Sequence, residues 1–273
     1  MDGVEVRVEH QLETPFGAPS DCLVEVQMAD RTVVFLPRHG RGHRLLPHEV
    51  NARANIHALK QLQVTHVLAV NAVGIMQEHI RPGDVVVPEQ IFDRTRGRRP
   101  STFFGDGIAG HVTFADPFCQ EMSQAIVQSA TAAGATVHQG GTYVCMEGPQ
   151  FSTRTESHFY RRQVDATVIG MTALPEAKLA REAEMCYGML AMGTDYDCWH
   201  EAEEDVSVEA VIQVLQANAR LANAVVAQIA GRLPHTSECA CLEAARYAII
   251  TAPEYIDDAV KERLGVLYGH YFH

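Results

Sequence analysis

Short runs of β-branched residues alternate with amphipathic helical patterns along most of this chain, and this alternation limits the folds that it can adopt. The predicted strands are Leu23–Met28, Thr32–Pro37, His66–Val70, Asp84–Pro88, Thr142–Met146, Ala166–Gly170 and Tyr187–Met192. The predicted helices are Val50–Gln63, Pro117–Ala133, Pro175–Ala183 and a long segment from Val208 to Ile229. Such alternation predicts a single α/β domain over residues 1–273, with a mixed, mostly parallel central sheet and helices on both of its faces.

Polar or small residues follow several of these strands directly. The segments concerned are Arg38–Gly40, Asn71–Gly74, Glu147–Phe151, Met171–Thr172 and Thr194–Asp197. Ligands of parallel α/β sheets bind beyond the carboxyl ends of the strands. We therefore expect these segments to form one composite site, and we expect Asn71–Gly74 to be a turn.

Composition excludes several classes of function. The net charge is −12, which disfavours binding to nucleic acid or to an anionic membrane. No apolar run approaches the roughly 18 residues of a spanning helix, so we expect a cytoplasmic protein. The seven scattered cysteines are typical of reduced, mostly buried thiols rather than of a disulfide framework. A redox or metal role for the Cys239-x-Cys241 pair stays open beside the simpler interpretation that both are isolated small residues.

Seven stretches of the chain, taken in order, resemble the methylthioadenosine phosphorylase branch of the purine nucleoside phosphorylase family. They span about Thr14 to Gly231 and are FLPRHGRGHRLLPHEVNARANIHALK, HVLAVNAVG, RPGDVVVPEQIFDRT, HVTFADPFC, EGPQFSTRTES, GMTALPEAKLA and AMGTDYDCWHEAEEDVSVEAV. The resemblance implies a homotrimer that cleaves the N-glycosidic bond of a purine nucleoside with inorganic phosphate. It implies no cofactor and no metal, and phosphate is a co-substrate.

The two ends of the chain depart from that pattern. The family usually begins with a strand and a glycine-rich turn that touches phosphate, whereas this sequence opens with MDGVEVRVEH. We therefore expect one phosphate contact to be absent or replaced by another group. Residues 234–273 match nothing in the family pattern and stay unassigned.

Binding of a phosphate dianion calls for a rigid guanidinium group, further donors and backbone N–H groups. Arg38 and His39 match the family's phosphate-binding pair, and Thr172 offers a hydroxyl at another strand end. Asn71 and Ala72 match a pair whose backbone approaches phosphate, although the family often has a hydroxyl at the first position. The simpler interpretations are a solvated loop and a tight turn.

Departure of a purine is easier when a carboxyl group gives a proton to N7, and a carboxylate can also accept from a 6-amino group. Asp195 and Asp197 match the family's purine-binding aspartates. We assign Asp195 as the N7 proton donor and Asp197 as the residue that assists or orients the 6-amino group, although a helix N-cap pair is the simpler interpretation. Phe151 matches an aromatic wall against the base, and Ser152 is expected to help position it.

The resemblance also assigns residues to the sugar and its 5′ substituent. Met171 matches the residue beneath the ribose, where a polarizable thioether suits a cationic ring. His43 matches a residue near the 5′ position, and Val208 with Val211 matches the apolar lining for a 5′-methylthio group. His111 matches a residue that reaches into a neighbouring subunit's site. Core packing is the simpler interpretation for Met171 and the two valines.

Three activities remain in view. The leading one is phosphorolysis of S-methyl-5′-thioadenosine to adenine and 5-methylthioribose 1-phosphate. The nearest alternative is a related phosphorylase that prefers adenosine or 6-oxopurine nucleosides. A third is a nucleoside-binding homologue without turnover. A metal cluster of His39, His43 and His48 is not expected, because the reaction needs no metal and arginines surround these residues.

Overall fold

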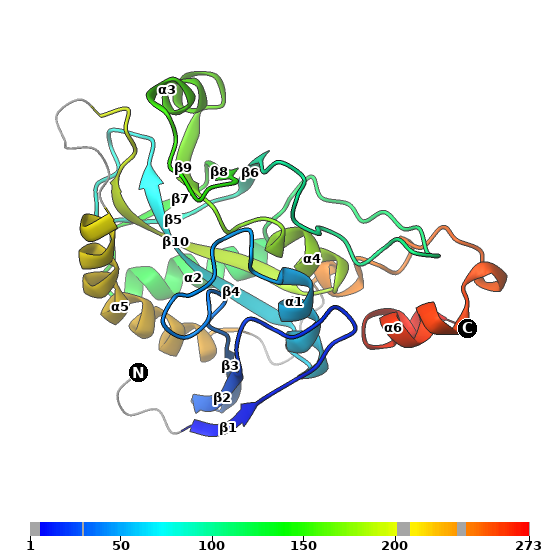
Figure 1. Ribbon diagram of the computed structural model, residues 1–273. Helices are drawn as coiled ribbons and strands as arrows, with labels where there is room; N and C mark the ends of the chain where they lie inside the picture. The colour runs from blue at the N-terminus through cyan, green and yellow to red at the C-terminus, as the bar shows by residue number, and fades with distance from the viewer. Residues whose placement is uncertain (1–5, 29, 201–207, 234–238, 273) are drawn as a thin grey trace.

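Figure 1 shows a computed structural model that describes residues 6–28, 30–200, 208–233 and 239–272, with side chains in the helix from Val208 described from Asn218 onward. A seven-stranded sheet with the order β6-β8-β9-β4-β10-β5-β7 forms its centre. These strands are β4 (His66–Ile75), β5 (Val85–Val87), β6 (Gln90–Arg94), β7 (Val137–Gln139), β8 (Thr142–Met146), β9 (Ala166–Gly170) and β10 (Cys186–Tyr196). Four neighbouring pairs are parallel and two are antiparallel, so the predicted mixed, mostly parallel sheet is confirmed.

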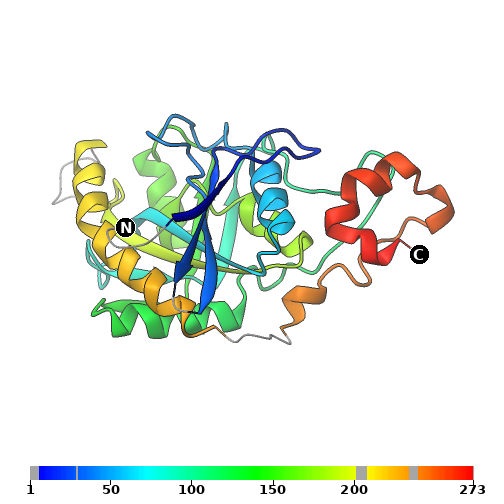
Figure 2. The same cartoon turned by 90° about the horizontal axis from the view of Figure 1, so that it is seen from below.

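Helices cover both faces of this sheet (Figure 2). The bounds of the helices are α1 (Ala52–Gln61), α2 (Gln120–Ala132), α3 (Arg154–Gln163), α4 (Glu176–Glu182), α5 (Val208–Ala230) and α6 (Asp258–Tyr268). The two faces are visible in the alternation along β10. Met189 belongs to a core cluster that also contains residues of α1 and α4, whereas Leu190 packs in a cluster with residues of α2 and α5. No helix in the described part of the chain is long and apolar enough to cross a membrane.

A second, three-stranded sheet is antiparallel and lies apart from the first. It consists of β1 (Val6–His10), β2 (Leu23–Met28) and β3 (Arg31–Phe35). The sequence predicts β2 and β3, but it gives no sign that they leave the central sheet. The Arg38–Gly40 segment therefore does not follow a strand of the central sheet, and that part of the strand-end argument is wrong.

Two further sequence expectations are corrected by the length of β4 and β10. Asn71–Gly74 is not a turn, because β4 continues to Ile75, and Thr194 to Tyr196 belong to β10 rather than following it. The two strands pair in parallel from Cys186 opposite His66 to Tyr196 opposite Ile75, with one register shift between Gly193 and Asp195. The small and polar residues in these two segments are typical of turns. Hydrogen-bonded pairing between β4 and β10 nevertheless keeps both segments extended.

The C-terminal segment contains three short 3-10 helices, Ala240–Glu243 (η1), Pro253–Tyr255 (η2) and Gly269–Tyr271 (η3), around α6. Figure 1 shows α6 at one end of the molecule, beside the loop that precedes α2. Gly110 forms a β-bridge with Ile249, and the Phe104 ring stacks on the Tyr268 ring at a centroid distance of 5.2 Å. These contacts fasten residues 239–272 to the body of the protein.

Close packing of α2 on β10 generates a test of the fold. A Cβ at Gly188 would lie 2.5 Å from Cγ of Met122 and 2.7 Å from Cδ1 of Ile126, both fully buried. We expect Gly188→Ala to lower the free energy of unfolding by about 1–3 kcal/mol, because the core must shift to accept the methyl group. In contrast, Gly265→Ala in α6 meets nothing within 4 Å and should raise stability by about 0.5–1 kcal/mol. Urea unfolding measures both changes, and equal effects of the two variants would contradict the described packing.

Candidate active site

One cavity of about 1160 Å³ opens where β4, β9 and β10 meet the loop after β3. Its lining combines cations, hydroxyl and amide groups, carboxyl groups and apolar side chains. The sequence-predicted site residues that line it are Arg38, His39, His43, Asn71, Ala72, Phe151, Met171, Thr172, Asp195 and Asp197. Arg38 and the two aspartates thus share one cavity, as the composite-site hypothesis requires.

Arg38 is a half-buried cation held by three acceptors. Its Nη1 donates to Oε1 of Glu176 at 2.8 Å, and its Nη2 donates to the Val70 carbonyl at 2.7 Å and to Oδ1 of Asn71 at 2.5 Å. Burial opposes the charge, but the Glu176 carboxylate together with Tyr187 and Tyr143 outweighs it, so the pKa of Arg38 is raised. The guanidinium group is therefore fixed in place and charged before any ligand arrives.

Asn71 connects Arg38 to Thr172. Its Oδ1 accepts from Arg38, and its Nδ2 donates to Oγ1 of Thr172 at 2.7 Å. A hydroxyl group that accepts from an amide keeps its own proton for another acceptor. Thr172 can thus donate to an anion in the cavity. The family often has a hydroxyl residue at position 71, and the asparagine found here connects two residues that are predicted to bind phosphate.

His39 lies next to this network and stacks on His43. The ring centroids are 4.3 Å apart with an angle of 7° between the planes, and Nδ1 of His39 lies 2.8 Å from the Leu45 carbonyl. Because that carbonyl only accepts, Nδ1 carries the proton of this bond. Burial lowers the pKa of His39, and the charges of Arg38 and His43 lower it further. A bound anion would reverse this effect and favour a second proton on the ring.

The two aspartates lie at the far end of the β4–β10 pair. Asp195 is paired with Gly74, and its Oδ2 accepts from Oγ1 of Thr194 at 2.5 Å. Asp197 is only 3% exposed, and its Oδ2 has no hydrogen-bond partner in the described part of the chain. Burial raises the pKa of Asp197, while the nearby Ser157 hydroxyl works in the opposite direction. Asp197 is therefore a carboxyl group suited to holding a proton in the cavity, in addition to the role predicted for Asp195.

Met171 and Phe151 contribute apolar side chains to the lining. Gly148 adopts a φ of 67° and approaches Met171 so closely that a Cβ there would lie 2.4 Å from the Met171 sulfur. Glycine at position 148 thus allows the thioether to pack against the turn after β8 and to face the cavity. Phe151 is 46% exposed at the rim.

Several predicted residues lie elsewhere or outside the described residues. Ser152 does not line the cavity, and its hydroxyl donates to the sulfur of Met146 at 3.4 Å. His111 is exposed, and its backbone N–H donates to the Ala248 carbonyl of the C-terminal segment. Val208 and Val211 fall within α5, but their side chains lie outside the described part of the structure. The roles of these residues stay predictions.

Glu176 belongs to the site, although the sequence did not single it out, and Thr194 of the predicted Thr194–Asp197 segment has a contact that the sequence did not assign. Glu176 neutralises Arg38 and also accepts from the Tyr187 hydroxyl at 2.9 Å. The Thr194 hydroxyl lies within hydrogen-bond distance of Oδ2 of Asp195 and of the Val73 carbonyl, and its one proton is shared between these two acceptors. Glu176 is in the first turn of α4, where an acidic residue is ordinary, so the sequence carries no signal for its function.

The cavity continues beyond the Arg38 network between β3 and β4. Val33 and Phe35 of β3 and Val67 of β4 contribute to its wall there. Over His66–Val73, β4 pairs with β10 on one side, and among the described residues no strand pairs with its other side. This second, largely apolar part explains why the cavity exceeds the volume of about 300–1,000 Å³ that is usual for a small-molecule site.

Comparison with known proteins gives concordant matches. The family model described as Phosphorylase superfamily matches residues 2–230. S-methyl-5′-thioadenosine phosphorylase of Geobacter sulfurreducens is 52% identical over 271 residues, covering 99% of this chain and 94% of the relative. The protein of the same name from Chloroflexus aurantiacus is 53% identical over 264 residues, covering 97% of this chain and 91% of the relative.

Solved structures agree with the sequence matches. A methylthioadenosine phosphorylase from an antarctic soil metagenomic library superposes with a TM-score of 0.93 at 45% identity, covering 98% of this chain and 94% of its own. A methylthioadenosine phosphorylase from Schistosoma mansoni, solved in complex with adenine, gives a TM-score of 0.84 at 37% identity, covering 89% and 92%.

Burial of Asp197 predicts a pH-dependent cost to stability. Since its folded pKa is raised, its contribution to stability is fully present below the unfolded pKa of about 4 and is lost as pH rises through the folded pKa. Asp197→Asn should remove that loss. The free energy of unfolding of the variant, relative to that of the wild type, should therefore increase as pH rises. Urea unfolding at a series of pH values measures the difference, and a difference that stays constant across the series would contradict the assignment.

Proposed function

The chain belongs to the phosphorylase superfamily, and we propose from this premise that it catalyses phosphorolysis of S-methyl-5′-thioadenosine, giving adenine and 5-methylthioribose 1-phosphate. The observation that carries the proposal is that Arg38 and the two aspartates line the same cavity. Such a cavity can hold a phosphate at one end and a nucleobase at the other. The relatives named above and the Schistosoma mansoni structure with adenine support the same choice of base.

Phosphate binds, in this proposal, at the Arg38 end of the cavity. The guanidinium group, the Thr172 hydroxyl and the backbone beside Ala72 face the dianion, and His39 takes up a proton as the anion raises its pKa. Because Glu176 and Asn71 already orient Arg38, little reorganisation is needed when phosphate enters. One phosphate oxygen then lies beside C1′ of the nucleoside.

Bond cleavage moves negative charge onto the purine. The C1′–N9 bond breaks and its electron pair goes to the base, while the proton of the Asp195 carboxyl group passes to N7. A phosphate oxygen forms the new bond to C1′. The adenine 6-amino group donates to the second carboxylate, that of Asp197. The polarizable sulfur of Met171 lies beneath the ribose and tolerates the positive charge that develops there. His43, Val208 and Val211 are proposed to line the 5′ position.

The assembly proposed for this chain is a homotrimer in which His111 reaches a neighbouring site. Support comes from the surface around His111, where the C-terminal segment exposes large apolar side chains. Tyr247 is 86% exposed and Ile250 is 66% exposed, and Ile250 donates its N–H to the Ala109 carbonyl beside His111. Exposed apolar patches of this kind mark protein interfaces.

The proposed setting is the cytoplasm, in salvage of purines and of the methylthio group. No disulfide joins cysteines in the described part of the chain, which fits a reducing compartment. Inorganic phosphate, the proposed co-substrate, needs no further cofactor for this reaction. No residue is assigned to a cofactor.

Thr172 provides a conservative test of phosphate binding. Thr172→Val keeps the shape of the side chain but removes the hydroxyl, so the KM for phosphate should rise about tenfold, the equivalent of roughly 1–1.5 kcal/mol. Thr172→Ser retains the hydroxyl and should stay near wild type. Steady-state assays of adenine release from methylthioadenosine, with phosphate varied, measure this change.

Two outcomes would overturn the proposed reaction. Adenine release that does not depend on phosphate excludes phosphorolysis. Tight purine binding with no turnover, together with no phosphate binding by calorimetry, supports a nucleoside-binding homologue instead. Both measurements use the full chain with its substrates, so no variant is needed to decide between the activities.

Asp195 tests the choice of base. Asp195→Asn replaces the carboxyl group assigned to protonation of N7 by an amide, which has no acidic proton to transfer but can donate hydrogen bonds to N7 and O6 of a 6-oxopurine. We expect the ratio of kcat/KM for methylthioadenosine to kcat/KM for inosine to fall by about 10²-fold, since each hydrogen-bond mismatch costs about 1–3 kcal/mol. Comparison of the two substrates in one variant cancels any loss of folded protein. An unchanged ratio would remove Asp195 from base recognition.

A further inference from the structure

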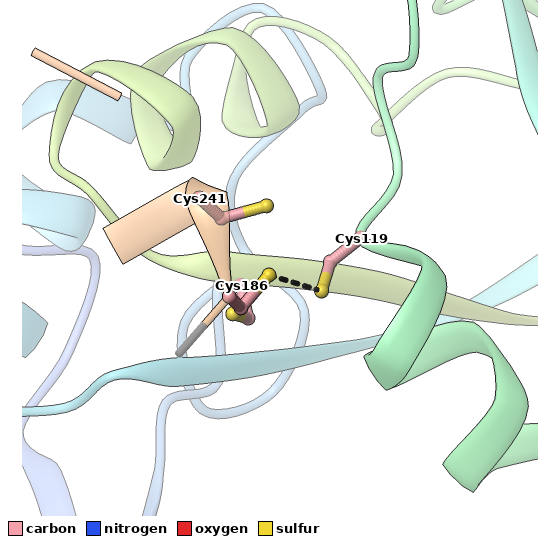
Figure 3. A group of neighbouring side chains, drawn as sticks. Cys119, Cys186 and Cys241 are labelled. Carbon is pink, nitrogen blue, oxygen red and sulfur yellow. Dashed lines mark hydrogen bonds between the residues drawn. The ribbon is translucent and has the colours of Figure 1, made fainter. Parts of the chain in front are cut away.

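Four cysteines from three separate segments meet at the start of β10, and none of them lines the cavity. Cys119 is the N-cap of α2, Cys186 is the first residue of β10, and Cys239 and Cys241 lie at the start of and within η1. Their four sulfur atoms all lie within 4.8 Å of one another, and the sulfurs of Cys119 and Cys239 are 3.5 Å apart. Figure 3 shows Cys119, Cys186 and Cys241 gathered in one place from their different segments.

The backbone around these thiols is held by hydrogen bonds. The N–H of Cys119 donates to the Tyr187 carbonyl, and the N–H of Cys186 donates to the Thr65 carbonyl, both at 2.8 Å. Cys119 and Cys186 are buried in the core cluster between the sheet and α2, and Cys239 and Cys241 pack against that cluster half-buried. The four sulfurs thus occupy positions set by a strand, a helix start and a 3-10 turn.

We propose that Cys119, Cys186, Cys239 and Cys241 form a structural zinc site. Four thiolates at about 2.3 Å from a tetrahedral Zn²⁺ lie about 3.8 Å apart, a value between the 3.5 Å contact and the 4.8 Å limit of the cluster. Thiolate ligands select Zn²⁺ over the hard cations Mg²⁺ and Ca²⁺. A set of four cysteines closes the coordination sphere, so the ion has no open position for substrate.

The proposed ion has a definite mechanical role. It joins η1, which opens the C-terminal segment, to the start of β10 and to α2. The superfamily match ends at residue 230, so the ion fastens a segment that lies beyond the match. None of the four cysteines lines the cavity, so the ion would make no contact with the substrate of the proposed reaction.

The test measures metal in the full-length protein, purified under reducing conditions without chelator and supplied with Zn²⁺ before desalting. Elemental mass spectrometry should find about one zinc per chain. Cys241→Ser should lose the metal, whereas Cys22→Ser, a half-buried cysteine outside the cluster, should keep it. Replacement by Co²⁺ should give the intense absorption of a tetrahedral thiolate complex in the wild type and in Cys22→Ser only.

Thermal unfolding supplies a second readout that does not depend on activity. A strong chelator should lower the Tm of the wild type and leave the Tm of Cys241→Ser unchanged. Absence of zinc after this treatment, iron in its place, or equal loss in Cys22→Ser would each overturn the proposal. An intact mass lower by two hydrogens for each bridge, found in the presence of Zn²⁺ and reductant, would show that the cluster forms disulfides instead.

Discussion

The parallel pairing of β4 with β10 sets the position of the cavity and of the helices packed around it. It runs from Cys186 opposite His66 to Tyr196 opposite Ile75, and side chains of β10 alternate between the two core clusters. The register shift after Gly193 places Asp195 opposite Gly74, two positions along β4 from Ala72 and three from Asn71. Both ends of the cavity are therefore fixed by one strand pair, and the helices pack around it.

Charge inside the cavity is balanced before a ligand is present. Arg38 is neutralised by Glu176, which also accepts from Tyr187, and Asn71 passes the orientation of Arg38 on to Thr172. At the other end, burial makes ionisation of Asp197 unfavourable. Functional sites commonly retain such groups at a cost to stability, because the same burial that disfavours the charge makes a carboxyl group a proton donor.

Much of the fold could be predicted locally. The bounds of β2, β8 and β9 match the predicted strands, because each is a β-branched run between turn-forming residues. The Thr153 and Glu156 capping box that begins α3 is also a local signal, and it could have revealed the unpredicted helix. In contrast, β1, β6 and β7 were not predicted, because short strands take their stability from the neighbours with which they pair.

Local patterns in the sequence suffice to predict the α/β class, the order of the main elements and ten of the residues that line the cavity, since the chemistry of a motif residue does not depend on where the fold places it. Only the tertiary structure decided that Asn71–Gly74 is a strand, that Glu176 compensates Arg38, that Asp197 is buried and that four distant cysteines meet. The reason is physical. Extension, charge compensation, burial and convergence each depend on a partner far away in the sequence, and no local pattern specifies where that partner will lie.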